Sequence, residues 1–91
     1  MDNDTLLFHD KGDGVVFKGI DIYPNRIESR VKNNFLFGYH TKIVYLKDIT
    51  GVKRVKGKQV RLMNRLMTDC SYRLSKHSQA EEFVRVLNSV M

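Results

Sequence analysis

Hydrophobic and polar residues alternate with a period of two along most of the chain, and the richest stretch covers residues 39–62. Its odd-numbered positions from 39 to 45 are aromatic or β-branched, which favours a strand with these side chains on one face. Residues 46–52 break the period with Asp48, Thr50 and Gly51, which indicates a bend before the strand resumes over 52–56. Gly57-Lys58 then predicts a two-residue turn, because glycine accepts the positive φ of a tight hairpin.

This turn predicts the register of a hairpin. Val55 lies opposite Val60 and shares the core face with it, and the return strand continues its alternation to Leu66. Arg54 lies opposite Arg61 on the other face, where like charges directly opposite one another destabilise a sheet. Two interpretations follow: a solvated basic face, or a site for an anion or an acidic partner.

Shorter segments with the same pattern lie on both sides of this hairpin. They predict strands over 6–8, 15–23, 26–31, 35–39 and 70–74, with turns at 10–14, 23–26, 33–34 and 68–69. The sequence Tyr23-Pro24-Asn25-Arg26 predicts a type I turn, because it has proline at its second position and asparagine at its third.

The period changes from two to 3.6 near the C-terminus, which predicts one amphipathic helix over residues 79–90. Ser78-Gln79-Ala80-Glu81 has the pattern of a capping box at its start. The apolar face, which must pack against the sheet, consists of Ala80, Phe83, Val84, Leu87, Val90 and Met91.

Composition predicts one globular domain over residues 1–91, with residues 1–4 as a loose polar start. The hydrophobic fraction of 42% is too high for a disordered chain. No apolar run approaches the roughly 20 residues that span a bilayer, and the first residues are acidic where a signal peptide is basic. The single cysteine, Cys70, cannot form an internal disulfide, which fits a reducing cytoplasm.

Positive charge is concentrated in the middle of the chain. Eight of the 16 lysines and arginines lie within residues 42–65, where Asp48 is the one acidic residue, although the whole chain has a net charge of +6. Such a stripe can attract nucleic acid, anionic lipid or an acidic protein, so the charge alone does not identify the partner. The candidate binding residues are Lys53, Arg54, Lys56, Lys58, Arg61 and Arg65.

Phe35, Phe37 and Tyr39 form an aromatic stripe with strand spacing. The interpretation we favour from the sequence is core or a contact with a protein partner or another copy of the chain. If the stripe is exposed, it is a candidate wedge for a membrane or a platform for stacking bases.

Nothing in the sequence predicts an enzyme, a metal site or a cofactor. His9, His40 and His77 fall in different predicted elements without ligand spacing, so we expect surface positions. Cys70 alternates with Tyr72 and Leu74, which favours a buried, unreactive thiol. The glycines of residues 12–14 match neither a dinucleotide fingerprint nor a phosphate loop.

The order of short strands followed by one helix resembles the bacterial pleckstrin-homology-like domain and the related GRAM group. The resemblance covers roughly residues 12–91 and rests on diffuse motifs: Ile22-Tyr23-Pro24-Asn25-Arg26-Ile27, the stretch 42–52, Tyr72-Arg73-Leu74, and Ala80-Glu81 near the start of the helix. It implies a mainly β (α+β) fold, a partly open barrel of two near-orthogonal antiparallel sheets with the C-terminal helix plugging one end. The chain departs from phosphoinositide-binding members, whose basic run surrounds the loop between the first two strands, because here that region offers Lys18 or Arg26 alone.

Three binding hypotheses remain open. The first is a protein-interaction module that uses a sheet edge or the groove beside the helix to bind a protein partner or itself, with Phe35, Phe37 and Tyr39 as contacts. The second is binding of nucleic-acid phosphates by the basic residues of 53–65, with steep salt dependence. The third is binding of an anionic membrane or a phosphorylated ligand, which follows from the resemblance alone. A small chain of this layout also suggests a bacterial or phage setting.

Overall fold

Seven strands and one helix make up the chain in this computed structural model, which describes residues 2–35, 37–66 and 70–91. The strands are β1 (Phe8–Asp10), β2 (Phe17–Tyr23), β3 (Arg26–Lys32), β4 (Tyr39–Tyr45), β5 (Ile49–Lys56), β6 (Gln59–Asn64) and β7 (Cys70–Arg73). A short 3-10 turn, η1 (Leu46–Asp48), joins β4 to β5, and α1 (His77–Val90) ends the chain.

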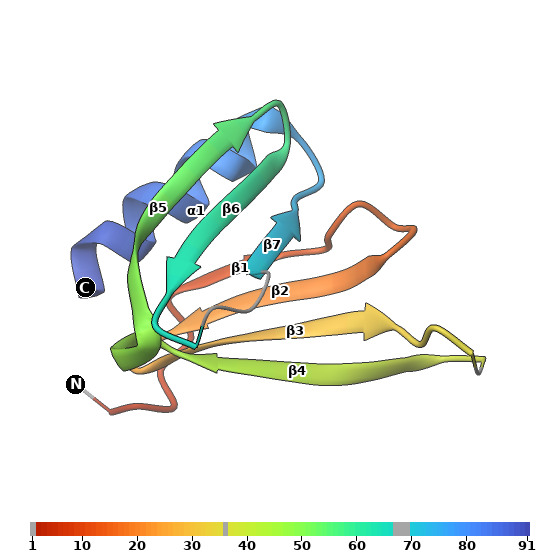
Figure 1. The fold of residues 1–91 in the computed structure, drawn as a ribbon, viewed down its shortest axis with the longest axis horizontal. Coiled ribbons are helices and arrows are strands. Elements are labelled where there is room, and N and C mark those ends of the chain that lie inside the picture. Colours follow the sequence, from red (N-terminus) through yellow and green to blue (C-terminus); the bar gives the residue numbers. More distant parts are fainter. Residues whose placement is uncertain (1, 36, 67–69) are drawn as a thin grey trace.

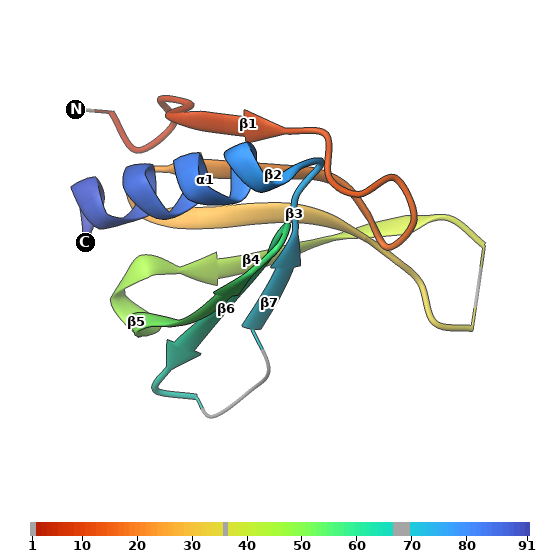
Figure 2. The same ribbon diagram turned by 90° about the horizontal axis from the view of Figure 1, so that it is seen from above.

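The strands form two antiparallel sheets, one of four strands in the order β1-β2-β3-β4 and one of three strands in the order β5-β6-β7. The strands of the two sheets run in clearly different directions, and α1 lies behind β5 and β6 (Figure 1). Seen from above, α1 lies over one end of the space between the sheets (Figure 2). The predicted mainly β fold, two sheets closed by a C-terminal helix, is therefore confirmed.

Phe83 shows how the helix packs against both sheets. Its fully buried ring lies 5.8 Å from the ring of Phe8 in one sheet and 5.4 Å from the ring of Tyr72 in the other, measured between centroids. Edge-on and tilted arrangements at these distances are the favourable ones for aromatic rings. One helical side chain therefore packs against both sheets. The other buried residues of the helix are Ala80, Val86 and Leu87.

The hairpin predicted at Gly57-Lys58 is correct in its register. Val55 pairs with Val60 and Arg54 with Arg61, and Gly57 has a φ of +58°. The prediction that Val55 belongs to the core is wrong, since its residue is 39% exposed while Val60 is fully buried. Val55 lies near the end of β5, an edge strand, where no neighbouring strand covers it.

Several predicted boundaries are wrong. The first two strands begin at Phe8 and Phe17, β4 begins at Tyr39, β6 ends at Asn64, and the bend before β5 is confined to η1. The turn predicted at residues 68–69 lies outside the described residues.

The helix begins two residues before the predicted start, at His77. Lys76 is the N-cap and no side chain caps the helix, so the predicted capping box at Ser78 is wrong. Met91 lies beyond the helix and is half exposed, so it is not part of the buried face.

No helix in residues 2–35, 37–66 and 70–91 is long and apolar enough to cross a membrane.

Candidate interaction surfaces

The loop that joins β3 to β4, residues 33–38, is held in shape by Asn33. Its backbone N–H donates to the carbonyl of Gly38 at 3.1 Å, and its side-chain Nδ2 donates to the carbonyl of Phe37 at 3.2 Å. Its Oδ1 lies 2.6 Å from Nδ1 of His40. Gly38 has a φ of +94°, a conformation that other residues rarely adopt, so the loop returns to the strand there. Hydrogen bonds therefore connect Asn33 to Phe37 and Gly38 at the other end of the loop.

Two phenylalanines of this loop project into solvent. Phe35 is 97% exposed and Phe37 is 106% exposed, so the expectation that they belong to the core is wrong. The reason is that the loop extends beyond the end of the two-sheet barrel, where no second layer faces it (Figure 1). Tyr39, at the start of β4, is half-buried and has Nζ of Lys18 5.6 Å from its ring centroid.

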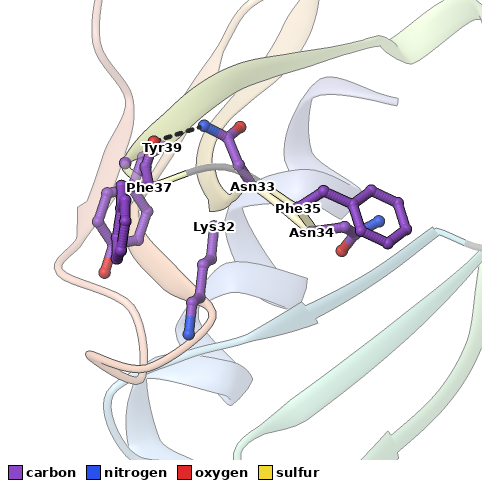
Figure 3. A pocket seen from close by; sticks show the side chains of 7 residues that line it. Lys32, Asn33, Asn34, Phe35, Phe37 and Tyr39 are labelled. Carbon is purple, nitrogen blue, oxygen red and sulfur yellow. Dashed lines mark hydrogen bonds between the residues drawn. The ribbon is translucent and has the colours of Figure 1, made fainter.

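The exposed rings surround a shallow hollow of about 400 Å³ at the tip of the hairpin, lined by Lys32, Asn33, Asn34, Phe35, Phe37, Gly38 and Tyr39. Phe37 and Tyr39 extend on one side of the hairpin, with Lys32 below them, and Phe35 points the other way (Figure 3). Exposed aromatic clusters of this kind mark contact surfaces more often than isolated apolar residues do.

Strand β4 continues this aromatic surface along a free sheet edge. Among the described residues its ladder partner is β3 alone. Ile43 and Tyr45 are each 46% exposed, and they share the outer face with Arg26 and Glu28 of β3, their partners across the ladder. We call Phe37, Tyr39, Ile43 and Tyr45 the aromatic edge.

The backbone groups at this edge can be assigned from two hydrogen bonds. Gly38 accepts from Asn33, and Leu46 donates to the carbonyl of Asn25 at 2.9 Å. Successive residues of an antiparallel strand direct their N–H and C=O groups alternately to the two sides. Even-numbered residues from 38 to 46 therefore face β3, and residues 39, 41, 43 and 45 offer their backbone groups to a strand that is added from outside.

A second surface, which we call the basic face, covers the outer face of β5, β6 and β7. The guanidinium-bearing residues Arg54 and Arg61 lie directly opposite each other, and Lys56 lies opposite Gln59. These four residues line one shallow polar hollow of about 140 Å³. None of the three strands contains an aspartate or a glutamate. Three of the six predicted basic residues are thus brought together.

The other three basic residues lie apart from this hollow. Lys53 is at the irregularity between Val52 and Arg54, and Lys58 is in the hairpin turn. Arg65 lies beyond β6, with Nη1 3.4 Å from the carbonyl of Lys47.

Arg73 of β7 joins the basic face and was missed in the sequence. It pairs with Gln59, the residue opposite Lys56. The signal was present, because Cys70, Tyr72 and Leu74 alternate as buried residues and leave Arg73 on the opposite face. The charge of Arg73 acts on Asp13. Burial raises the pKa of Asp13, but backbone N–H groups of residues 15–17, together with the Arg73 charge, outweigh that effect and lower it.

Among the residues that the structure describes, His9, His77 and Cys70 lie in three different environments. His9 is exposed and lies 2.5 Å from a carboxylate oxygen of Asp21, and His77 is exposed with Nδ1 2.5 Å from the carbonyl of Gly57. Cys70 is buried, with Sγ 3.7 Å from the hydroxyl oxygen of Tyr72, and burial raises the pKa of that tyrosine. In the described part of the chain no three His, Cys, Asp or Glu side chains gather where a metal ion could bind.

Comparisons with protein-family models, with curated proteins and with solved structures found no match. The resemblance to the bacterial pleckstrin-homology-like domain therefore stays a prediction.

Proposed function

We propose that this chain is a non-enzymatic interaction module that binds a protein partner through the aromatic edge and the adjacent Phe35. One observation carries the proposal: Phe35 and Phe37 are fully exposed on a hydrogen-bonded loop, and this loop continues into β4, which is an edge strand of its sheet in the described part of the chain. Burying one such ring removes about 1.5–3 kcal/mol of unfavourable hydration, and no element of the described chain does so. A strand that adds to β4 gains backbone hydrogen bonds and covers the rings together.

The proposal is tested by capture with the tagged protein from a lysate of its native cell, with nuclease present and at two salt concentrations. We expect a protein to be retained regardless of nuclease and salt, and to be lost with Phe35→Ser combined with Phe37→Ser. Val15→Ser is the matched control, since Val15 is an exposed apolar residue of another loop. Retention that is the same for all three proteins contradicts the proposal, and co-sedimentation with acidic phospholipid vesicles would assign the rings to a membrane instead.

A second function, binding of a nucleic-acid backbone, is supported by the basic face. Arg54, Lys56 and Arg61 share one hollow on strands without acidic residues, and Arg73 extends it. Phosphates are the anions that such a face fits, and each phosphate contact adds about 0.9 to the slope of log affinity against log salt concentration on duplex DNA.

Fluorescence anisotropy with single-stranded and double-stranded oligonucleotides tests this second function. We expect Arg54→Gln with Lys56→Gln to weaken binding and to reduce the salt slope by about two. Lys11→Gln with Arg30→Gln removes the same charge from exposed positions elsewhere and is the control. Equal losses in both double variants would mean that net charge, and not this face, attracts the nucleic acid.

A further inference from the structure

The aromatic edge has a chemical symmetry about Thr41. Counting outward from Thr41 along the side of β4 that offers its backbone, the chain presents Ile43 and then Tyr45 in one direction. In the other direction it presents Tyr39 and then, in the loop directly before β4, Phe37. An antiparallel copy of the same strand reverses this order. Each aromatic or β-branched side chain then meets another one.

We propose that the partner of the aromatic edge is a second copy of this chain, with β4 paired antiparallel to β4 about a twofold axis at Thr41. This inference rests on the proposed function, because it names the partner of the same surface. Tyr39 lies opposite Ile43 and Thr41 meets Thr41, and Phe37, in the loop directly before β4, comes to the end of the paired strands where Tyr45 of the other copy lies. Aromatic–aromatic, aromatic–β-branched and Thr–Thr pairs are the favourable cross-strand pairs, and such an interface is isologous, so every contact occurs twice.

The backbone supports this register. Residues 39, 41, 43 and 45 direct their N–H and C=O groups to the free edge, so Thr41 pairs with Thr41, and Tyr39 with Ile43, at hydrogen-bonded positions. The two four-stranded sheets then join into one continuous sheet. Lys42, on the opposite face of the strand, lies across from His40 of the other copy.

Two neighbouring registers are worse. An axis at Lys42 places two lysines directly opposite each other, which is destabilising. An axis at Ile43 pairs Ile43 with itself but sets Tyr39 against Lys47, which lies beyond β4, and moves Phe37 away from Tyr45 of the other copy. Of these three registers, the one with its axis at Thr41 brings Phe37 to an aromatic side chain of the other copy.

Sedimentation equilibrium and cysteine cross-linking test the inference. We expect the wild-type chain to have twice its single-chain mass of 10.6 kDa at high concentration, and Phe37→Ser to weaken the dimer at least tenfold while Val15→Ser does not. Thr41→Cys should link two chains under mild oxidation, because hydrogen-bonded pairs have Cα atoms about 5.5 Å apart, within disulfide range. Ile43→Cys should not link, since the two Ile43 positions are about 13 Å apart in this register. The wild-type protein, which retains the buried Cys70, controls for that thiol.

The possible failures differ from one another. Linking through Ile43→Cys without linking through Thr41→Cys overturns the register. A chain that stays monomeric at all concentrations, yet still retains another protein through Phe35 and Phe37, overturns the second copy as partner and leaves the proposed function standing. A monomer whose protein capture is insensitive to both rings overturns both.

Discussion

Asp10 and Ser75, which are 65 residues apart in the sequence, are joined by two hydrogen bonds: the Ser75 hydroxyl donates to Oδ1 of Asp10 at 2.6 Å, and the Ser75 backbone N–H donates to Oδ2 at 2.7 Å. Asp10 is 3% exposed and also accepts from Gly12 N–H and from Nε2 of Gln79, at 2.9 and 3.1 Å. This one carboxylate connects β1, the loop after it, and the start of α1.

We therefore expect Asp10→Ala to destabilise the fold by about 3 kcal/mol, because it leaves buried donors without an acceptor. Ser75→Ala removes one of the four bonds and should cost about 1 kcal/mol. Urea unfolding followed by circular dichroism measures both. A cost below about 0.5 kcal/mol for Asp10→Ala would mean that water replaces the carboxylate, and that the network does not hold the helix in place.

The same carboxylate gives the protein a predictable acid sensitivity. Burial raises the pKa of Asp10, but hydrogen bonds from Ser75, Gln79 and Gly12 outweigh it and hold the pKa below its usual range, and the pKa of Asp13 is lowered in the same sense. The unfolded chain therefore binds more protons than the folded one as pH falls below the ordinary aspartate pKa of about 3.9. The stabilisation is complete above that pH and is lost as pH falls through the folded-state pKa values.

The free energy of unfolding, measured from pH 6 to pH 2.5, should thus decline most steeply below about pH 4. Asp10→Ala should decline less over the same interval, because one of the carboxylates with a lowered pKa is gone. Parallel curves for the two proteins would show that Asp10 does not contribute to the acid sensitivity.

The start of α1 offers a third prediction. Lys76 is the N-cap and supplies no capping side chain, and a cation near the positive end of a helix is unfavourable. Lys76→Asp should raise the free energy of unfolding by about 1 kcal/mol, since aspartate can accept from the free backbone N–H groups of the first turn. Ser78→Ala, which would remove the cap predicted from the sequence, should change stability by less than about 0.5 kcal/mol. The reverse result would mean that the helix begins at Ser78 in solution.

Local signals in the sequence were enough to predict the hairpins and the helix. Gly57-Lys58 and Tyr23-Pro24-Asn25-Arg26 are turn sequences flanked by alternating residues, and the register of β5 on β6 followed directly. Such features depend on a few neighbouring residues, so a sequence pattern contains them.

The wrong predictions concern burial and contacts between residues that are far apart in the sequence. Alternation places Phe37 and Tyr39 on one face, but it does not say whether another layer covers that face, and here the barrel ends before the loop. The helix starts early because Asp10 binds Ser75 and Gln79 just before and within its first turn, a contact from the other end of the chain. Alternation in the sequence places Arg73 on an outer face, but it does not show that β7 pairs with β6, which brings Arg73 beside Gln59 on the basic face.

The loop between β1 and β2 contains two glycines with positive φ that should respond differently to the same substitution. Gly12 has a φ of +75°, and a Cβ there would lie 2.5 Å from the carbonyl oxygen of Phe17. Gly14 has a φ of +81°, and a Cβ there would meet nothing within 4 Å. Both positions cost a residue with a side chain about 1–2 kcal/mol for the left-handed conformation, but only Gly12→Ala also forces a backbone group to move. We expect Gly12→Ala to lower the free energy of unfolding by at least about 1 kcal/mol more than Gly14→Ala, measured by urea unfolding.

Gly12→Ala should also disturb Asp10, whose carboxylate accepts a hydrogen bond from the Gly12 N–H. Gly12→Ala combined with Asp10→Ala should therefore destabilise by less than the sum of the two single changes. Equal costs at the two glycines would mean that the loop shifts freely, and that its close approach to Phe17 does not position Asp10.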